Sequence, residues 1–557
     1  TDRFLEKCFI SKIIARYVVL NETLKCLMVL RSYQYYAVEK IVGKVVTNSG
    51  NGYIWHTTGS GKTLTSFKAS QILQMNEKVS KVVFVVDRKD LDSQTISEFN
   101  AFEKDCVDHS DKTASLIEHL KTKDLVITTI QKLNKAVTTE KYAKQIEHLQ
   151  DEKVIFIFDE CHRSQFGSES KFNEKKSKGM RHSIVGTDGE GGFFRNTQLF
   201  GFTGTPILKF NNQRGQTTKD IFKDCLHKYL VKDAIADDNV LGFSVEYINT
   251  IKSKEGSKDQ DVKSIDTKEV LEDPKRLNLV ANNILKIHPK KTNNQTFTSI
   301  FAVSNIPTLI KYYDIFKSSK DHDLKIAAIF SYGVNEDPED SDGMPKDQSR
   351  DALDRMIVDY NDMFGTNFST DAKSFPKYHS DLSKRFKKND KSSNPCKGRV
   401  KNQIDMLLVV NMFLTGYDSK PLNTLYVDKN LEAHGLVQAF SRTNRTFTEK
   451  KSFGNVICYR NLIDNVETAF REFSDENSLD EVIKEPFAVY QSEFEEAVKT
   501  LKEIVPEVHD VDAIQSEEGQ LQFVKAYREV ERALSKAEMF SEFSWDNSPI
   551  AQQELVD

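Results

Sequence analysis

The sequence predicts an α/β protein with two lobes, each built on a parallel β-sheet, followed by a C-terminal helical region. Short apolar runs alternate with amphipathic stretches along most of the 557 residues, which is the pattern of successive β–α units on parallel sheets. The runs fall into two sets, so we expect two sheets. After Arg460 the strand pattern stops, and residues 462–537 have helical periodicity, with Pro486 and Pro506 as breaks.

The two sets of strand-length runs are separated by a polar stretch. In the first lobe the expected strands are 53–55, 82–86, 125–129, 154–158 and 199–203. In the second lobe they are 298–303, 325–330, 406–410, 424–427 and 455–459. The residues between the sets, 251–273, are rich in Lys, Asp and Ser and predict a solvated connector.

These patterns also suggest domain boundaries. We expect an N-terminal remnant or linker at 1–30, the first lobe at 31–250, the connector at 251–273, the second lobe at 274–461 and the helical region at 462–557. Within the second lobe, 332–401 contains Asp-Pro, Asp-Gly and Met-Pro turn signals and ends in a basic run. It is therefore expected to be an insertion.

Composition excludes several classes of protein. Lys and Arg total 78 against 83 Asp and Glu, for a net charge of −5, so any nucleic-acid contact must use local patches on a mildly acidic body. No apolar run reaches the length of a membrane span, so we expect no membrane partner. Seven cysteines without a CxxC pair favour a reducing compartment over a zinc site, and the cytoplasm is the expected location.

The most informative motif follows the strand at 53–55. Its glycines allow backbone N–H groups to surround phosphate oxygens, its lysine supplies a positive charge, and its last hydroxyl can bind Mg²⁺. These residues are Thr58, Gly59, Ser60, Gly61, Lys62 and Thr63. His56 stands where the phosphate-loop pattern has its first Gly. The alternative interpretation is a glycine-rich turn before a helix.

A second motif follows the apolar run 154–158, which is continuous, as in a strand buried on both faces. Asp159 at its end can hold Mg²⁺, and Glu160 is placed to polarise a water for attack on a γ-phosphate. The alternative is a solvated acidic pair at a strand end. The phosphate loop upstream favours the functional interpretation.

A third motif lies in the second lobe, where Gln438 and Arg442 are one helical turn apart and Arg445 follows three residues later. If the segment is helical, all three side chains lie on one face. Two guanidinium groups on that face could reach a γ-phosphate, as arginine fingers do. The alternative is a surface helix with ion pairs.

Together these motifs resemble superfamily 2 helicase-like ATPases, and more closely the motor part of the R subunit of type I restriction–modification enzymes. The resemblance extends over most of the chain, from Arg31 to Tyr459. It is carried by residues 31–38, 55–63, 86–91, 159–165, 202–206, 415–418 and 438–445. It implies two RecA-like lobes, with ATP and Mg²⁺ bound at the lobe interface and lobe closure coupled to ATP.

The resemblance also implies a role at each matching position. Gln34 corresponds to a glutamine that reads adenine. Lys62 and Thr63 correspond to the phosphate lysine and magnesium hydroxyl, Asp159 to the metal-side acid and Glu160 to the catalytic base. The remaining matches are Thr203 and Thr205, which couple hydrolysis to movement, Gly416 and Asp418, which touch nucleotide and DNA, and Arg442 and Arg445, which act as fingers.

DNA contacts are expected at strand ends. Hydroxyl and amide groups there can bind phosphates without reading sequence, as a translocating motor requires. The candidates are Arg88, Lys89, Thr128, Thr129, Gln131 and Ser304. For the hydroxyls the alternative is ordinary capping of strand and helix ends. Basic segments 171–181 and 384–401 could hold a duplex or be solvated loops.

The resemblance implies a double-stranded-DNA translocase, partnered by the methyltransferase and specificity subunits of a restriction–modification complex. R subunits carry a nuclease domain before the motor, and only about 30 residues precede Arg31, too few for such a fold; we therefore expect DNA cleavage to depend on a nuclease domain outside this chain. Two alternatives remain: a strand-separating helicase on DNA or RNA, and an ATP-gated DNA-binding scaffold without turnover.

Overall fold

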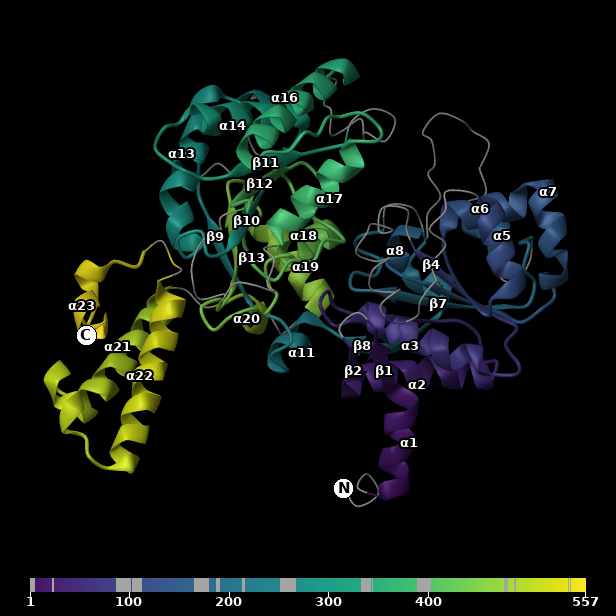
Figure 1. The fold of residues 1–557 in the computed structure, drawn as a ribbon, viewed down its shortest axis with the longest axis horizontal. Helices are drawn as coiled ribbons and strands as arrows, with labels where there is room; N and C mark the ends of the chain where they lie inside the picture. The colour runs from purple at the N-terminus through teal and green to yellow at the C-terminus, as the bar shows by residue number, and fades with distance from the viewer. Residues whose placement is uncertain are drawn as a thin grey trace. The chain divides into compact units, whose positions relative to one another are not determined.

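The computed structural model of the protein describes most of the chain. The described residues are 6–22, 25–86, 102, 113–164, 180–186, 191–212, 216–250, 267–331, 342, 344–387, 402–474, 479–484, 487–538, 540 and 542–556. They form two compact units, Thr1–Ala234 and Ile235–Asp557 (Figure 1). Each unit is built on its own β-sheet.

The first unit contains a six-stranded sheet in which every neighbouring pair is parallel, in the order β5-β4-β6-β7-β3-β8. Its strands are β3 (Gly52–His56), β4 (Lys81–Val86), β5 (Leu125–Thr129), β6 (Val154–Phe158), β7 (Thr197–Thr203) and β8 (Asp224–Tyr229). The first five confirm the expected strands. The sequence analysis missed β8, an edge strand whose burial is only partial, because it lacks a continuous apolar run.

Helices cover this sheet. They are α2 (Ser32–Val46), α3 (Lys62–Gln74), α5 (Thr113–Thr122), α6 (Ile130–Thr138), α7 (Glu140–Ala143), η1 (Lys144–Leu149), α8 (Cys161–Ser164), α9 (Met180–Val185) and α10 (Thr218–Phe222). The apolar stripe Val38, Ile41 and Val45 of α2 packs in one core with Phe67 of α3 and Phe84 of β4, as expected for an amphipathic helix on a buried sheet.

An N-terminal helix and hairpin precede this sheet. Helix α1 (Lys7–Tyr17) leads into β1 (Val18–Asn21), which pairs antiparallel with β2 (Cys26–Val29). The hairpin is absent from the sequence-based expectations. Tyr17 and Val19 are buried in the same core as α2 and α3, so this segment is part of the first unit.

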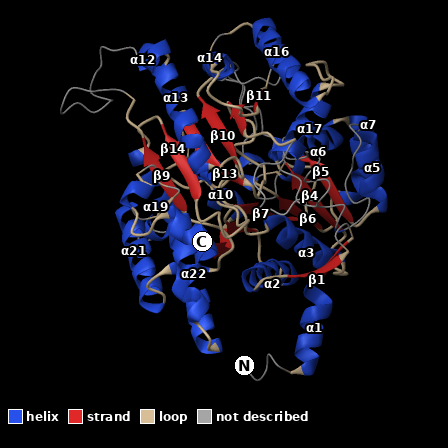
Figure 2. Ribbon diagram, turned by 60° about the vertical axis from the view of Figure 1, so that its left-hand side comes forward, coloured by secondary structure: helices blue, strands red, loops and turns tan. Residues whose placement is uncertain are grey.

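The second unit contains another all-parallel sheet, in the order β11-β12-β10-β13-β14-β9. Its strands are β9 (Phe243–Tyr247), β10 (Thr298–Val303), β11 (Ile326–Ile329), β12 (Met406–Val409), β13 (Leu422–Asp428) and β14 (Gly454–Cys458). Several of them lie side by side in Figure 2. Strand β9 pairs with β14, so residues 243–247 belong to this sheet, although the sequence analysis placed the junction later, at 251–273.

The helices of the second unit follow the expected alternation, and the insertion contains two of them, α16 and α17. The unit's helices before the C-terminal region are α12 (Thr267–Leu271), α13 (Pro274–Lys291), α14 (Ile306–Ser318), α16 (Lys346–Phe364), α17 (Phe375–Phe386) and α18 (Ala433–Phe440). Helix α11 (Val231–Ala236) crosses the boundary between the two units. Asp273 caps α13 by accepting hydrogen bonds from two backbone N–H groups of its first turn.

The C-terminal region is helical, as the sequence predicted. It comprises α19 (Ile463–Ser474), α20 (Leu479–Val482), α21 (Phe487–Ile504), η3 (Val508–Ala513), α22 (Glu517–Ala537), η4 (Trp545–Asn547) and α23 (Gln552–Val556). Helices α21 and α22 lie side by side (Figure 1) and share a core that includes Phe494, Val498 and Val530. The expected fold class, two parallel-sheet α/β units followed by helices, is therefore confirmed.

A buried ion cluster ties α13 to the carboxyl ends of β13 and β14. Asp428, fully buried, accepts two hydrogen bonds from Arg276 at 2.9 and 3.0 Å. It also accepts bonds from Arg460 and from the Tyr312 hydroxyl, each at 2.6 Å. Burial opposes charge on this carboxylate, but its bonds to Arg276 and the charges of both arginines outweigh that effect and hold the pKa of Asp428 below its usual value.

Removing the carboxylate should destabilise the second unit strongly. Asp428→Asn leaves the buried guanidinium of Arg276 and the partly buried one of Arg460 without their counter-charge, so the free energy of unfolding should fall by about 3–5 kcal/mol. Asp314→Asn is the matched control, because the Asp314–Arg355 pair is about half exposed (48% and 51%) and such pairs contribute less than about 1 kcal/mol. Denaturant unfolding followed by circular dichroism measures both; equal losses would contradict the prediction.

Candidate functional site

The phosphate loop lies where the sequence predicted it, between β3 and α3. Gly61 is the N-cap of α3 and has a left-handed backbone, with φ of +74°. A Cβ at this position would lie 2.6 Å from Nε2 of Gln34. Glycine is therefore required here both for the backbone conformation and for the close approach of α2.

Two neighbouring side chains of α2 hold the loop. The Tyr33 hydroxyl donates to the Ser60 carbonyl at 2.8 Å, and Gln34 Nε2 donates to the Ser60 and Gly61 carbonyls at 3.0 and 3.3 Å. Gln34 Oε1 accepts from the Arg31 backbone N–H at 2.9 Å. The amide of Gln34 thus supports the loop, while its role in reading adenine stays a prediction.

The acidic motif follows β6 and meets the loop lysine. Lys62 Nζ lies 3.5 Å from Glu160 Oε1, and His162 Nδ1 lies 3.5 Å from Glu160 Oε2. Glu160 has a φ of +40°, an unfavourable conformation for a residue with a Cβ, which costs about 1–3 kcal/mol and is concentrated at functional sites. The structure therefore brings together the predicted phosphate lysine and the predicted base.

The Thr203–Thr205 segment adjoins both motifs. His162 Nδ1 lies 2.9 Å from Thr203 Oγ1, which also accepts from the Thr205 backbone N–H at 3.0 Å. A Cβ on Gly204 would lie 3.1 Å from the His56 carbonyl, so this segment packs directly against the start of the phosphate loop. No role was predicted for His162 or Gly204, although both lie within the ranges 159–165 and 202–206 that carry the family resemblance.

The oxygen donors beside the loop suit a magnesium ion. Mg²⁺ prefers hard oxygen ligands and is held by one or two carboxylates, together with waters and substrate phosphates, rather than by an all-protein cage. The Thr63 hydroxyl and the Asp159 carboxylate supply such oxygens. Within the part of the chain that the structure describes, no group of three or more His, Cys, Asp or Glu residues could hold a metal.

The second unit groups another set of predicted residues. Arg445 Nε donates to Asp418 at 2.5 Å, and Arg442 donates to the carbonyls of Tyr417 and Gln438 at 2.5 and 3.0 Å. Packing opposes charge on Asp418, but Arg445 and Arg442 outweigh it and lower its pKa. Gly416, with a left-handed φ of +74°, turns the chain just before this cluster.

The prediction that Gln438, Arg442 and Arg445 lie on one helical face is wrong beyond Phe440. Helix α18 ends there, and Arg442 lies in the turns that follow. Arg445 instead forms an antiparallel bridge with Val240, and the Leu241 N–H donates to the Asn444 carbonyl at 2.8 Å. Pairing with this neighbouring segment overrides the helical periodicity of residues 438–445.

The predicted DNA-contact residues at strand ends differ in their surroundings. Thr129 caps α6 by accepting from the Lys132 N–H at 3.2 Å, which is the alternative role of ordinary capping. Thr128 is 1% exposed, and its hydroxyl, like the side-chain oxygen of Gln131, has no hydrogen-bond partner in the described parts of the chain. Ser304 directly follows β10. Arg88, Lys89 and 388–401 lie outside the described residues, as does most of 171–181.

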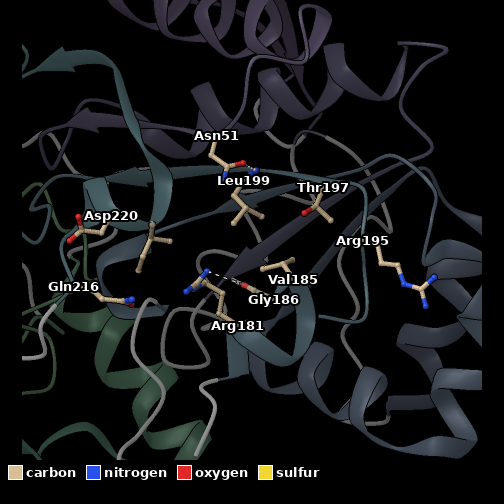
Figure 3. Close-up of a pocket in the computed structure, with 10 residues that line it drawn as sticks. Asn51, Arg181, Val185, Gly186, Arg195, Thr197, Leu199, Gln216 and Asp220 are labelled. Carbon is tan, nitrogen blue, oxygen red and sulfur yellow. Dashed lines mark hydrogen bonds between the residues drawn. The ribbon is translucent and has the colours of Figure 1, made fainter. Parts of the chain in front are cut away.

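A cavity of about 320 Å³ lies elsewhere in the first unit (Figure 3). Asn51, Thr197 and Leu199 line it, which places it at the amino ends of β3 and β7. The phosphate loop follows the carboxyl end of β3. Ligands of open parallel sheets bind at the carboxyl ends of the strands, so this cavity is not part of the candidate site.

Comparisons with known proteins agree with this geometry. Three family models match in succession: SWI2/SNF2 ATPase over 33–276, type I restriction enzyme subunit R domain 3 over 295–461, and the C-terminal model of subunit R of type I restriction and modification enzymes over 482–557. A type I restriction enzyme endonuclease subunit of Staphylococcus aureus (strain COL) is 46% identical across 99% of this chain. A putative C-terminal part of such a subunit from Mycoplasma pneumoniae is 40% identical, over 29% of this chain and 85% of that protein.

The chain belongs to the type I restriction enzyme R-subunit family. It spans 57% of the length of the Staphylococcus relative. Among solved structures, a fragment of a putative HsdR subunit from Vibrio vulnificus aligns with 80% of this chain and 66% of its own, at 16% identity and a TM-score of 0.46.

Membrane insertion by a helix finds no support among the described residues. None of the helices there is both long and apolar enough to cross a bilayer.

Replacing Gly61 should destabilise the first unit through two effects. Gly61→Ala strains a left-handed position, at about 1–2 kcal/mol, and displaces Gln34 from the loop carbonyls, at about 1 kcal/mol more. Gly50→Ala is the control, because Gly50 has a φ of +89° and a Cβ there would have nothing within 4 Å. Fluorescence of Trp55 during denaturant unfolding, in a Trp545→Phe background, reports this unit. Equal losses would exclude the Gln34 contribution.

Proposed function

We propose that this chain is the ATP-driven motor part of a type I restriction enzyme R subunit and translocates double-stranded DNA. The observation that carries the proposal is the meeting of Lys62 on the phosphate loop with Glu160 at the end of β6, 3.5 Å apart. Membership of the R-subunit family, with a SWI2/SNF2 ATPase match over residues 33–276, supports it.

The first unit would supply most of the hydrolytic chemistry. Lys62 and the loop N–H groups would bind the β- and γ-phosphates of ATP, and Glu160 would accept a proton from the attacking water. Thr63 and Asp159 would hold Mg²⁺, which neutralises charge on the phosphates. The ion pair between Lys62 and Glu160 holds the proposed base next to the phosphate site.

Thr203 and Thr205 would couple hydrolysis to movement. Thr203 bonds to His162, and His162 lies beside Glu160. A displacement of the Glu160 carboxylate would therefore be transmitted through His162 to the Thr203–Thr205 segment. The proposal also requires Arg442 and Arg445, with Gln438, Gly416 and Asp418 around them, to reach the same nucleotide from the second unit. Arginine fingers of this kind contribute factors of about 10³–10⁵ in turnover.

The proposed partners are double-stranded DNA and the methyltransferase and specificity subunits of a restriction–modification complex. The printed names of the relatives, endonuclease subunits of type I restriction enzymes, support this assignment. On the first unit, Gln131, just after β5, is proposed for phosphate contacts, as is Ser304 on the second, whereas Thr128 is buried at 1% exposure.

A strand-separating helicase is the second candidate function. It shares the two parallel-sheet units and the same nucleotide motifs, so pulling on a duplex and splitting it are distinguished by experiment rather than by these residues. The scaffold alternative predicts binding without turnover and has less support, because Lys62, Asp159, Glu160, Arg442 and Arg445 are all present.

Removal of the base should separate binding from turnover. Glu160→Gln keeps the shape of the side chain but cannot accept a proton, so ATP should still bind while kcat falls by about 10²–10⁴. Glu147→Gln, an exposed glutamate in η1, is the matched control and should behave as wild type. Steady-state phosphate release and equilibrium binding of a fluorescent ATP analogue measure the two properties; undiminished turnover in Glu160→Gln would reject the assignment.

A triplex-displacement assay tests the mechanical function. With ATP and Mg²⁺, the chain together with its methyltransferase and specificity partners should displace a third strand from a duplex without releasing single strands. Arg445→Lys keeps the charge but loses the bidentate geometry of the guanidinium, and should slow displacement and ATP turnover together. Release of single strands would favour the helicase, and ATP binding without turnover would favour the scaffold.

A further inference from the structure

The first residue of the phosphate loop is a buried histidine that the mechanism above does not use. His56 is fully buried at the end of β3, at the position where the phosphate-loop pattern has glycine. Its Nε2 lies 2.9 Å from Nδ1 of His227 on β8. A ring at this position would be costly to bury without a structural use for its polar atoms.

The hydrogen bond between the two rings constrains their protons. A bond between two neutral imidazoles needs one N–H donor and one lone pair. Nδ1 of His56 has no hydrogen-bond partner among the described residues. If Nε2 of His56 donates, that buried Nδ1 is only an unpaired acceptor, whereas the opposite arrangement would bury an unpaired N–H. The first arrangement therefore costs less, and it leaves both rings neutral.

Strand β8 and helix α2 also hold the loop backbone. The Thr57 N–H donates to the Tyr229 carbonyl at 2.8 Å, two residues after His227 on β8. The Tyr229 ring stacks on Tyr33, with centroids 3.6 Å apart, and Tyr33 bonds to the Ser60 carbonyl. His56 packs edge-on against both tyrosines. The loop is thus fastened at its first residues by β8 and further along by α2.

We propose that His56 and His227 are positioning residues for the phosphate-binding loop, a pair of neutral imidazoles whose hydrogen bond fixes the start of the loop so that its N–H groups face the nucleotide phosphates. The inference rests on the proposed ATP-binding function of this loop. It adds a role for an edge strand that carries no recognised motif.

Acid should weaken this arrangement. Burial, the neighbouring His227 and Lys62 hold the pKa of His56 well below its usual value. The pKa of His227 is also lowered, mainly by burial and in addition by the charge of Lys40. The nearby Asp233 raises it, but by less. The other titratable side chains packed against His56 are Tyr33 and Tyr229. Both folded-state pKa values lie below those of the unfolded chain, so the stabilisation is complete above about pH 6.5 and is lost as the pH falls below it.

Three variants test the proposal. His56→Leu removes the bond. A double variant combines His56→Gln with His227→Asn. The glutamine keeps a donor near the position of Nε2, and the asparagine keeps an acceptor oxygen near the position of Nδ1. The double variant therefore restores the hydrogen bond without a titratable group. His148→Gln is the matched control, because His148 is exposed in η1.

Two measurements on the intact chain are compared. In nucleotide-free protein, His56→Leu should speed hydrogen–deuterium exchange of the amides at 57–61 by about tenfold, with the double variant close to wild type. The dissociation constant of a fluorescent ADP analogue should rise about tenfold or more in His56→Leu, while kcat changes much less, because the loop binds phosphates in the ground state as well as in the transition state. The double variant should also lose the acid-side weakening of affinity between about pH 5 and 7.

The outcomes separate this inference from the proposed function. Faster exchange with unchanged nucleotide affinity, or a double variant no better than His56→Leu, would overturn the positioning role while leaving ATP hydrolysis by Glu160 intact. A wild-type chain that binds no nucleotide, with Lys62→Ala indistinguishable from it, would overturn both. Faster amide exchange together with weaker nucleotide binding in His56→Leu, with His148→Gln unchanged, supports the positioning role of His56 and His227.

Discussion

The order of strands in the first sheet is the constraint on which the candidate site depends. In an all-parallel sheet every strand delivers its carboxyl end to the same edge, and β6, β7 and β3 are consecutive neighbours. Their carboxyl ends carry the acidic pair, the Thr203–Thr205 segment and the phosphate loop. Residues far apart along the chain therefore meet within hydrogen-bond range, as Trp55 and Gly204 do at 3.2 Å.

The second unit uses its strand ends differently. The carboxyl ends of β13 and β14 converge on Asp428, which joins Arg276 of α13 to Arg460. Such a cluster is satisfied only in one arrangement of the helix and the sheet, so it specifies their packing more than it adds stability. The pair of Asp418 and Arg445 differs from this cluster, because its side chains are 45% and 12% exposed and solvent therefore screens it more.

Much of this architecture could be predicted from the sequence, because its signals are local. A continuous apolar run such as 154–158 identifies a strand buried on both faces, and Gly59 to Thr63 identify the loop by residue type and spacing. The missed features depend on partners distant in the sequence. Strand β8 is half-buried at a sheet edge and has no apolar run, so neither it nor the pairing of His227 with His56 could be predicted. Arg445 leaves the helical period because Val240 pairs with its backbone.

The backbone between β8 and the second-unit motif has a mechanical consequence. The Tyr229 carbonyl is bonded to the phosphate loop, and the Val240–Leu241 segment is bonded to Asn444 and Arg445. Between these two anchors the chain contains α11, whose six residues advance only about 9 Å. With the remaining residues extended, the tether reaches about 26 Å at most. Tyr229 and Val240 therefore cannot lie further apart than this length while α11 remains helical.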